Sequence, residues 1–327
     1  MDELISQGWM PVDAVVVDGR PGLLWMDLGD VQFTEPFFQQ TVDRVRAEQR
    51  PERFTEFDAL LQLEKVLDSV EPTGFIFHSS RCGSTLLANV CRSLDDAVVL
   101  SEANAIDKVV ARFITDAGDP VKESLYSVFL RGVVKALAQR RTGNECHLFI
   151  KFSCCSISQL QRIRRIWPRV PWVFLYRDPI ETIVSNMTTV PSWLIDEDHR
   201  VLAYITGVSP EAITEMSLEE RCARSIGSFY STAHNLANAD SMLLNYNQLS
   251  VPSLLSILRF FNVDVSNAEL ERITSGSRIY SKEISGAREF TPDSDTKQKF
   301  ASDLVREMAE RWAIEPYNLL ERSGEQS

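Results

Sequence analysis

Residues 75–87 (FIFHSSRCGSTLL) combine a short apolar run, a turn of small polar residues and the start of an apolar helical stripe. Arg81 supplies a cation, and Gly83 permits close approach of the backbone to a ligand. Ser84 and Thr85 add hydroxyls and the unpaired amides of a helix start, which favour an anion. The segment predicts an anion-binding loop; the alternative is an ordinary strand-to-helix turn with serine as the helix cap.

The triphosphatase form of such a loop is GxxxxGK[ST], in which the lysine reaches the β- and γ-phosphates. Here Ser84 stands in the place of that lysine, and no glycine precedes Gly83 at the required spacing. The cation, Arg81, lies before the glycine instead. These departures argue against ATP or GTP as the ligand. A nucleotide-dependent kinase with a degenerate loop remains an alternative, and it predicts binding of ATP with Mg²⁺.

A second segment, residues 173–187 (VFLYRDPIETIVSNM), also places charge at the end of an apolar run. Arg177 follows the run directly, and Pro179 is typical of the first turn of a helix. Ser185 lies about two turns further on. An arginine and a helical serine can hold one phosphate together through charge-assisted and neutral hydrogen bonds. The alternative is a surface ion pair between Arg177 and Asp178, which contributes little.

Together the two segments resemble the sulfotransferases that use 3′-phosphoadenosine 5′-phosphosulfate (PAPS). The family's 5′-phosphosulfate loop, [K/R]-x-G-[T/S]-[T/S]-x-[L/W], reads RCGSTLL at residues 81–87. Its 3′-phosphate motif, R-[D/N]-P-x-[D/E]-x-x-x-S, reads RDPIETIVS at residues 177–185. Both occur in the family's order, each after an expected strand. The resemblance covers about residues 74–320.

This resemblance implies transfer of a sulfuryl group from PAPS to a hydroxyl, or a similar nucleophile, of a small-molecule acceptor, with release of the desulfated nucleotide PAP. Arg81 would contact the 5′-phosphosulfate, and Arg177 and Ser185 would bind the 3′-phosphate. The residues implied in donor binding are Arg81, Cys82, Gly83, Ser84, Thr85, Leu86, Arg177 and Ser185. A descendant that binds nucleotide without catalysis is a further alternative.

Negative charge grows on the bridging oxygen as the bond to the nucleotide breaks, so a cation there lowers the barrier. Arg81 is the first candidate for this role. Lys151, at the end of the apolar run 147–152, is the second, and many bacterial relatives resemble it in having a lysine at this strand end. They continue with [ST]-P, whereas this chain reads FIKFSCC. Lys151 could instead serve only as an ion-pair partner.

A hydroxyl acceptor also requires a general base. Glu102 directly follows the apolar run 97–100, at the sheet edge expected for Arg81, and some bacterial sulfotransferases resemble it in using a glutamate near this place. Alternatively, Glu102 has no catalytic role and is present because the helix dipole favours an acidic residue at the start of a helix. His78, in front of the phosphate loop, is the second candidate. Trp193 lies in a long loop, where it lines an acceptor pocket or anchors a core.

Composition narrows the class of protein. The net charge of −12 argues against a nucleic-acid partner, which requires clustered cations. No apolar run reaches the length of a membrane span, and the acidic start does not resemble a signal peptide. The six cysteines form no CxxC pair, so no structural zinc site is expected. We therefore expect a cytoplasmic protein without a membrane or metal partner; a homo-oligomer stays open.

The elements that position these residues follow from periodicity. From residue 75 onward, apolar runs at 75–78, 97–100, 147–152, 172–176 and 242–246 alternate with helical patterns. Such strands predict an α/β fold with a three-layer parallel sheet covered by helices on both faces. The resemblance implies that this sheet has a P-loop-like sulfotransferase architecture. Ligands of these sheets bind beyond the carboxyl ends of the strands. The sulfotransferase domain is expected over residues 73–322.

Residues 1–72 are expected to form a small N-terminal addition. Runs at 14–17 and 23–27 flank a Gly/Pro turn and predict a β-hairpin, and helical patterns follow at 35–49 and 54–69. Two later segments depart from the family's pattern. LLNYNQL (243–249) lacks the acidic pair of a similar strand end. Residues 276–290, with Arg278, Lys282 and Arg288, only partly resemble its basic nucleotide-closing loop.

Overall fold

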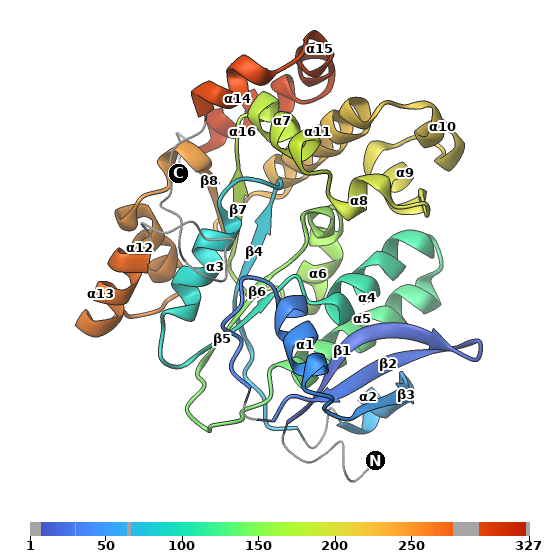
Figure 1. Ribbon diagram of the computed structural model, residues 1–327, viewed down its shortest axis with the longest axis vertical. Coiled ribbons are helices and arrows are strands. Elements are labelled where there is room, and N and C mark those ends of the chain that lie inside the picture. Colours follow the sequence, from blue (N-terminus) through green and yellow to red (C-terminus); the bar gives the residue numbers. More distant parts are fainter. Residues whose placement is uncertain (1–7, 30, 64–66, 277–293, 325–327) are drawn as a thin grey trace.

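The computed structural model describes residues 8–29, 31–63, 67–276 and 294–324 (Figure 1). Its centre is a five-stranded sheet in the order β5-β6-β4-β7-β8, in which all neighbouring pairs are parallel. The strands are β4 (Pro72–His78), β5 (Ala97–Ser101), β6 (His147–Lys151), β7 (Trp172–Tyr176) and β8 (Ser241–Asn245). The predicted parallel sheet is confirmed.

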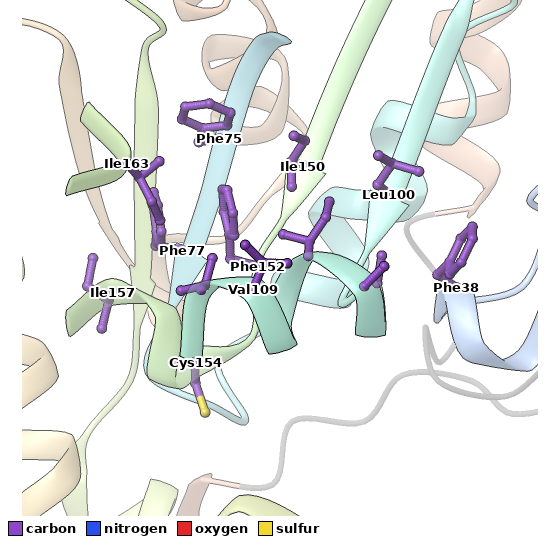
Figure 2. Packing of buried hydrophobic residues seen from close by; sticks show 14 of the residues in the cluster. Phe38, Phe75, Phe77, Leu100, Val109, Ile150, Phe152, Cys154, Ile157 and Ile163 are labelled. Atoms are coloured by element: carbon purple, nitrogen blue, oxygen red, sulfur yellow. The ribbon is translucent and has the colours of Figure 1, made fainter. Parts of the chain in front are cut away.

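Alternation along the strands explains why both faces of the sheet are covered. In β4, Phe75 and Phe77 belong to one apolar cluster and Ile76 to another. Successive strand side chains point to opposite faces, so a strand that is apolar throughout must be buried on both. Figure 2 shows Phe77 beside Phe152, with ring centroids 4.8 Å apart. The three-layer prediction is confirmed.

The helices divide between these two faces. Helices α3 (Ser84–Arg92), α12 (Val251–Phe260) and α13 (Asn267–Gly276) supply the smaller cluster. The larger cluster is supplied by α1 (Phe38–Ala47), α4 (Asn104–Thr115), α5 (Pro120–Leu137), α6 (Leu160–Ile166), α7 (Pro179–Thr188), α11 (Leu218–Leu236), α15 (Asp303–Trp312) and α16 (Ile314–Gly324). The short helices are α2 (Asp58–Leu63), α8 (Ser192–Ile195), α9 (Arg200–Thr206), α10 (Pro210–Glu215), α14 (Ser294–Phe300) and the 3-10 turns η1 (Cys154–Gln159) and η2 (Tyr246–Gln248).

The N-terminal segment contains the predicted hairpin and one strand more. Strands β1 (Trp9–Val17) and β2 (Arg20–Asp27) join through Asp18 and Gly19, whose positive φ angles of 49° and 76° suit a two-residue hairpin turn. The prediction of a helix from residue 54 was wrong for its first residues. Strand β3 (Glu52–Glu56) pairs with β2, because tertiary pairing outweighs a short helical pattern.

The N-terminal elements share a core with the main sheet. Strand β1 packs against α4 and α5, and α1 adds Phe38 to the buried cluster that contains Leu100 of β5 (Figure 2). Trp25 of β2 is fully buried, and its indole donates a hydrogen bond of 2.8 Å to the hydroxyl of Thr55. The domain boundary between residues 72 and 73 stays a prediction.

The strand order also locates the crevice where a ligand of this sheet would bind. From central β4 the chain runs to β5 and β6 on one side and then to β7 and β8 on the other. Such a reversal opens a crevice at the carboxyl end of the central strand. The loop after β4 is the predicted anion-binding loop, so its place in the fold agrees with that role. No helix in the described ranges is long and apolar enough to span a bilayer.

Candidate functional site

The loop between β4 and α3 has the backbone of an anion-binding turn. Ser80, Arg81 and Gly83 have positive φ angles of 74°, 52° and 82°. Successive turns of this kind orient amide groups toward a common concavity, and α3 begins at Ser84 with amides that lack intrahelical acceptors. Cys82 instead points inward, where its thiol donates to the Leu175 carbonyl oxygen at 3.0 Å.

Gly83 cannot be replaced without strain. A Cβ atom there would lie 2.4 Å from Cδ1 of Leu249. The backbone of Gly83 also has a positive φ angle, which residues other than glycine rarely adopt. The glycine therefore lets the loop close onto the segment after β8 while α3 starts at once. The packing against Leu249 therefore explains why the motif has a glycine at this position, without reference to a ligand.

Arg81 reaches across to the end of α7. Its Nη2 donates to the Thr189 carbonyl oxygen at 2.7 Å, and its Nε donates to Oδ1 of Asn186 at 3.3 Å. The hydroxyl of Ser80 donates to the same Oδ1 at 3.0 Å. Asn186 is fully buried and joins the two motif segments. Sequence reasoning missed Asn186, although it directly follows Ser185 of the second motif.

Arg177 is held inside the protein. Its side chain is 3% exposed, and its Nε donates to Oε2 of Glu181 at 2.7 Å. The guanidinium carbon lies 4.1 Å from the ring centroid of Tyr246, and the Tyr230 hydroxyl donates to the Arg177 carbonyl oxygen at 2.5 Å. Ser294 of α14 also bonds to both members of the ion pair. The charge partner of Arg177 is therefore Glu181.

Helix α7 presents the rest of the second motif. Asp178 caps the helix by accepting from the Glu181 amide at 3.0 Å, instead of pairing with Arg177 at the surface. Ser185 is half-buried on the same helix, two turns beyond Arg177. Because α7 carries Glu181, Ser185 and Asn186, it links the surroundings of Arg177 to those of Arg81.

The ends of β4, β5 and β6 bring together three residues that are far apart in the sequence. Lys151 is 1% exposed on its side chain, and its ammonium group donates a hydrogen bond to Oε1 of Glu102. Nε2 of His78 lies 3.3 Å from the same oxygen. The three candidates for catalysis at this edge, predicted separately, therefore form one contiguous cluster.

The surroundings of Glu102 favour its ionised form. Burial raises the pKa of Glu102, but the positive charge of Lys151 and the hydrogen bond from His78 outweigh it. The pKa of the carboxyl consequently lies well below its usual range. The positive φ of 51° at Glu102 and the bond of 2.7 Å from its amide to the Lys151 carbonyl oxygen fix the carboxylate beside the lysine.

A second carboxyl, which sequence reasoning missed, lies nearby on α4. Asp107 accepts from the Ser153 amide at 3.3 Å and from the Ser156 hydroxyl at 3.5 Å. Burial and the negative charge of Glu102 raise the pKa of Asp107 to about 7. The carboxyl lies deep among protein atoms, yet solvent reaches it through a hollow that it lines together with Trp193.

Trp193 packs against the core, and its role in an acceptor pocket stays a prediction. Its ring lines this hollow and also lies 6.2 Å from the ring of Phe229. Residues 277–290 of the expected nucleotide-closing loop, with Arg278, Lys282 and Arg288, lie outside the described residues.

Hydrogen-bond donors gather at two places on these segments. One is the amide turn with Arg81, and the other is Arg177 with the hydroxyl of Ser185 on the same helix. A phosphate at the second place would share Arg177 with Glu181. Within the described part of the chain, no group of three or more His, Cys, Asp and Glu side chains could hold a metal ion.

No protein-family model and no curated protein sequence matches this chain. Among solved structures it is similar to a sulfotransferase domain from the curacin biosynthetic pathway, at 14% identity and a TM-score of 0.39, covering 78% of this chain and 98% of that one. It is also similar to mouse sulfotransferase SULT7A1 complexed with PAP, at 13% identity and a TM-score of 0.41, covering 78% of this chain and 90% of that one. The similarity to sulfotransferase STF9 from Mycobacterium avium has 8% identity and a TM-score of 0.43, and it covers 79% of each chain.

Proposed function

We propose that the protein is a PAPS-dependent sulfotransferase that acts on a hydroxyl, or a similar nucleophile, of a small molecule. The observation that carries this proposal is the meeting of the two motif segments at one edge of the sheet. Asn186 of α7 accepts hydrogen bonds from Ser80 and Arg81 of the loop after β4. In this proposal, two anion sites with different donor sets lie on connected elements, as a nucleotide with separated 5′ and 3′ anionic groups requires.

Each site has a distinct role in this proposal. The amides of Gly83, Ser84 and Thr85 surround the 5′-phosphosulfate, and Arg81 neutralises its charge. Cys82 and Leu86 complete the loop by packing it against the sheet and α12. Arg177 and Ser185 bind the 3′-phosphate, which distinguishes this donor from ATP.

The cluster at β5 and β6 belongs to the transfer step. Lys151 and Arg81 stabilise the negative charge that develops on the departing phosphate oxygen. Glu102 orients the lysine ammonium group through the ion pair between them. Two carboxylates at this edge, Glu102 and Asp107, are candidates to accept the proton of the acceptor, and geometry decides between such candidates before pKa does.

Thermal-shift titrations with PAP, and in parallel with ATP plus Mg²⁺, test this proposal. Bound PAP at concentration c adds RT ln(1 + c/Kd) to the free energy of unfolding, so we expect the melting temperature to rise with PAP concentration and Ser185→Ala to weaken this rise. Ser256→Ala, an exposed serine on α12, is the matched control. A larger response to ATP plus Mg²⁺, or none to PAP, would overturn the proposal and favour the kinase. Binding of PAP without any transfer would favour a non-catalytic descendant.

A further inference from the structure

A hollow of about 290 Å³ lies between α4, the turn η1 and α8. Asp107 lines it from α4, Ser153 and Ser156 line it from the turn, and Trp193 lines it from α8. Asp196, Asp198, Lys108 and Ser192 add further polar groups, and Val110, Ile114, Val201 and Leu202 add apolar ones. Small-molecule sites have this character, with a few polar groups in a largely apolar wall.

A second hollow, of about 540 Å³, lies between the hairpin and α4. Val15, Val16 and Phe57 are among the residues that line it. The two hollows share Lys108, Ala111, Asp196, Asp198 and Val201 in their linings. They are therefore adjacent along α4, and the two hollows together are called the channel.

Chain connectivity places the inner hollow close to the proposed donor site. Ser153 follows Lys151 by two residues, and Trp193 follows Thr189, whose carbonyl oxygen holds Arg81, by four. A residue spans at most about 3.5 Å, so the Cα atom of Ser153 lies within about 7 Å of that of Lys151, and the Cα atom of Trp193 lies within about 14 Å of that of Thr189. Both walls of the hollow continue directly into the cluster that the transfer step requires.

We propose that this channel binds the acceptor, an elongated and mostly apolar alcohol or phenol, and that Asp107 accepts the proton of its hydroxyl group. This inference rests on the proposed function and adds the acceptor site and the base. The outer hollow, beneath the hairpin, holds the apolar body of the acceptor. The inner hollow holds the hydroxyl group beside Asp107.

Asp107 suits this role better than Glu102 because of what each carboxyl contacts. Glu102 is engaged by the charged Lys151, whereas Asp107 accepts only neutral donors in its described contacts, the Ser153 amide and the Ser156 hydroxyl. A base is most effective when its pKa lies near the working pH, and that of Asp107 is about 7. The charged groups that face Asp107 or line its hollow are Glu102, Lys151, Lys108, Asp196 and Asp198, with His78 behind Glu102.

The bonds of the step balance. The acceptor oxygen forms a bond to sulfur as the bond between sulfur and the bridging oxygen breaks, and that electron pair leaves on the 5′-phosphate of PAP. The acceptor proton passes to the carboxylate of Asp107. The products are the sulfate ester, PAP and a protonated Asp107, which returns its proton to solvent through the hollow.

Binding of 4-ethylphenol and 4-hexylphenol to the complex with PAP, measured by isothermal titration calorimetry, tests the channel. Each buried methylene strengthens binding, so we expect at least about a tenfold gain for the longer chain. Val16→Glu on the hairpin should remove this gain and leave 4-ethylphenol binding unchanged. Val121→Glu, at an exposed valine on α5, is the matched control. Equal binding of both phenols, or an unchanged gain in Val16→Glu, would overturn the channel.

Asp107→Asn tests the base. We expect it to bind PAP and 4-hexylphenol as the wild type does, to lose about 10²- to 10⁴-fold in the rate of transfer, and to lose the rise of that rate near pH 7. Asp107→Glu should recover part of the rate, and Asp43→Asn, at an exposed carboxyl on α1, should change nothing.

The outcomes separate the two proposals. If PAP does not bind the wild type, the proposed function fails. If PAP binds and 4-hexylphenol is sulfated by Asp107→Asn at the wild-type rate, or if Glu102→Gln instead removes the rise near pH 7, only the role of Asp107 is contradicted. If PAP binds and neither phenol does, the acceptor class is contradicted.

Discussion

The loop after β4 and the start of α7 each supply one arginine to the proposed donor site, but they hold it differently. Arg81 donates to neutral oxygens, those of Asn186 and the Thr189 carbonyl, at a partly exposed position. Arg177 is buried, ion-paired to Glu181 and stacked on Tyr246. An anion can displace neutral acceptors from Arg81 easily, whereas at Arg177 it must share the guanidinium with a buried carboxylate.

Because of this difference, we expect substitutions of the two arginines to affect the stability of the protein and the binding of the ligand to different degrees. Removing one partner of a buried ion pair leaves an uncompensated charge in the interior, which is costly, whereas removing a hydrogen bond to a backbone carbonyl near the surface costs little. Arg177 should therefore matter for folding as well as for the ligand, and Arg81 mainly for the ligand. The predictions that follow test this contrast, from the largest expected loss of stability to the smallest.

Arg177→Ala should lower the free energy of unfolding by about 3–5 kcal/mol, because Glu181 is left buried without its cation. The double variant Arg177→Met with Glu181→Leu should recover most of that loss, since it removes both charges and fills the space. Chemical denaturation followed by circular dichroism measures both values. PAP binding should be lost in both variants. A double variant that still binds PAP would contradict the assignment of Arg177 to the 3′-phosphate.

Gly83→Ala should cost more than the about 1–2 kcal/mol expected for a side chain in the left-handed region alone. The control is Gly143→Ala, because Gly143 has a similar φ of 84° and no atom within 4 Å of an added Cβ. The difference between them measures the clash with Leu249, so Leu249→Ala should partly rescue Gly83→Ala. Equal losses of stability in the two glycine variants would show that the loop does not close on Leu249.

Asp107→Asn should change stability by an amount that depends on pH. The pKa of Asp107 in the folded protein, about 7, lies above its value of about 3.9 in an unfolded chain, so its contribution to stability is fully present below pH 4 and is lost as pH rises through 7. The variant removes that loss. Its melting temperature relative to the wild type should increase by a few degrees between pH 4 and pH 8. A constant difference would place the carboxyl in an ordinary, solvated setting.

Arg81→Gln should show the smallest effect on folding, within about 0.5 kcal/mol of the wild type, because the amide nitrogen takes the place of Nε and can still donate to Oδ1 of Asn186. The rate of transfer should nevertheless fall by about 10²- to 10³-fold, as for the loss of one oxyanion donor. Parallel measurement of melting temperature and PAP formation checks both statements. A large loss of stability with an unchanged rate would reverse the contrast between the two arginines.

The places of the two motif segments in the fold could be predicted from the sequence better than the carboxyl cluster at β5, β6 and α4, for a physical reason. The loop at residues 81–87 and the motif at 177–185 are contiguous, and a strand–turn–helix places such residues without knowledge of the rest of the fold. Asn186, which bridges them, and the partner of Arg177 required the packing of α7. The sheet and its layers could be predicted from the apolar strands. Strand β3 could not be predicted, because its pairing with β2 is a long-range contact.

The cluster of Lys151, Glu102 and Asp107 combines residues from distant parts of the chain. Lys151 and Glu102 were each predicted as candidates, but their ion pair depends on β5 and β6 being neighbours. Asp107 lies within an amphipathic helix, where a single acid reads as an ordinary surface residue. Only the approach of η1 and α8 to α4 encloses it. The hollow beneath the hairpin likewise arises from the packing of β1 on α4.

The most direct test of the account compares the binding of PAP and of adenosine 5′-phosphate to the wild-type protein by isothermal titration calorimetry. The two ligands differ only in the 3′-phosphate assigned to Arg177 and Ser185. Charge-assisted hydrogen bonds contribute about 1.5–3 kcal/mol each, so PAP should bind at least about tenfold more tightly. Equal affinities would contradict the 3′-phosphate site and, with it, PAPS as the donor.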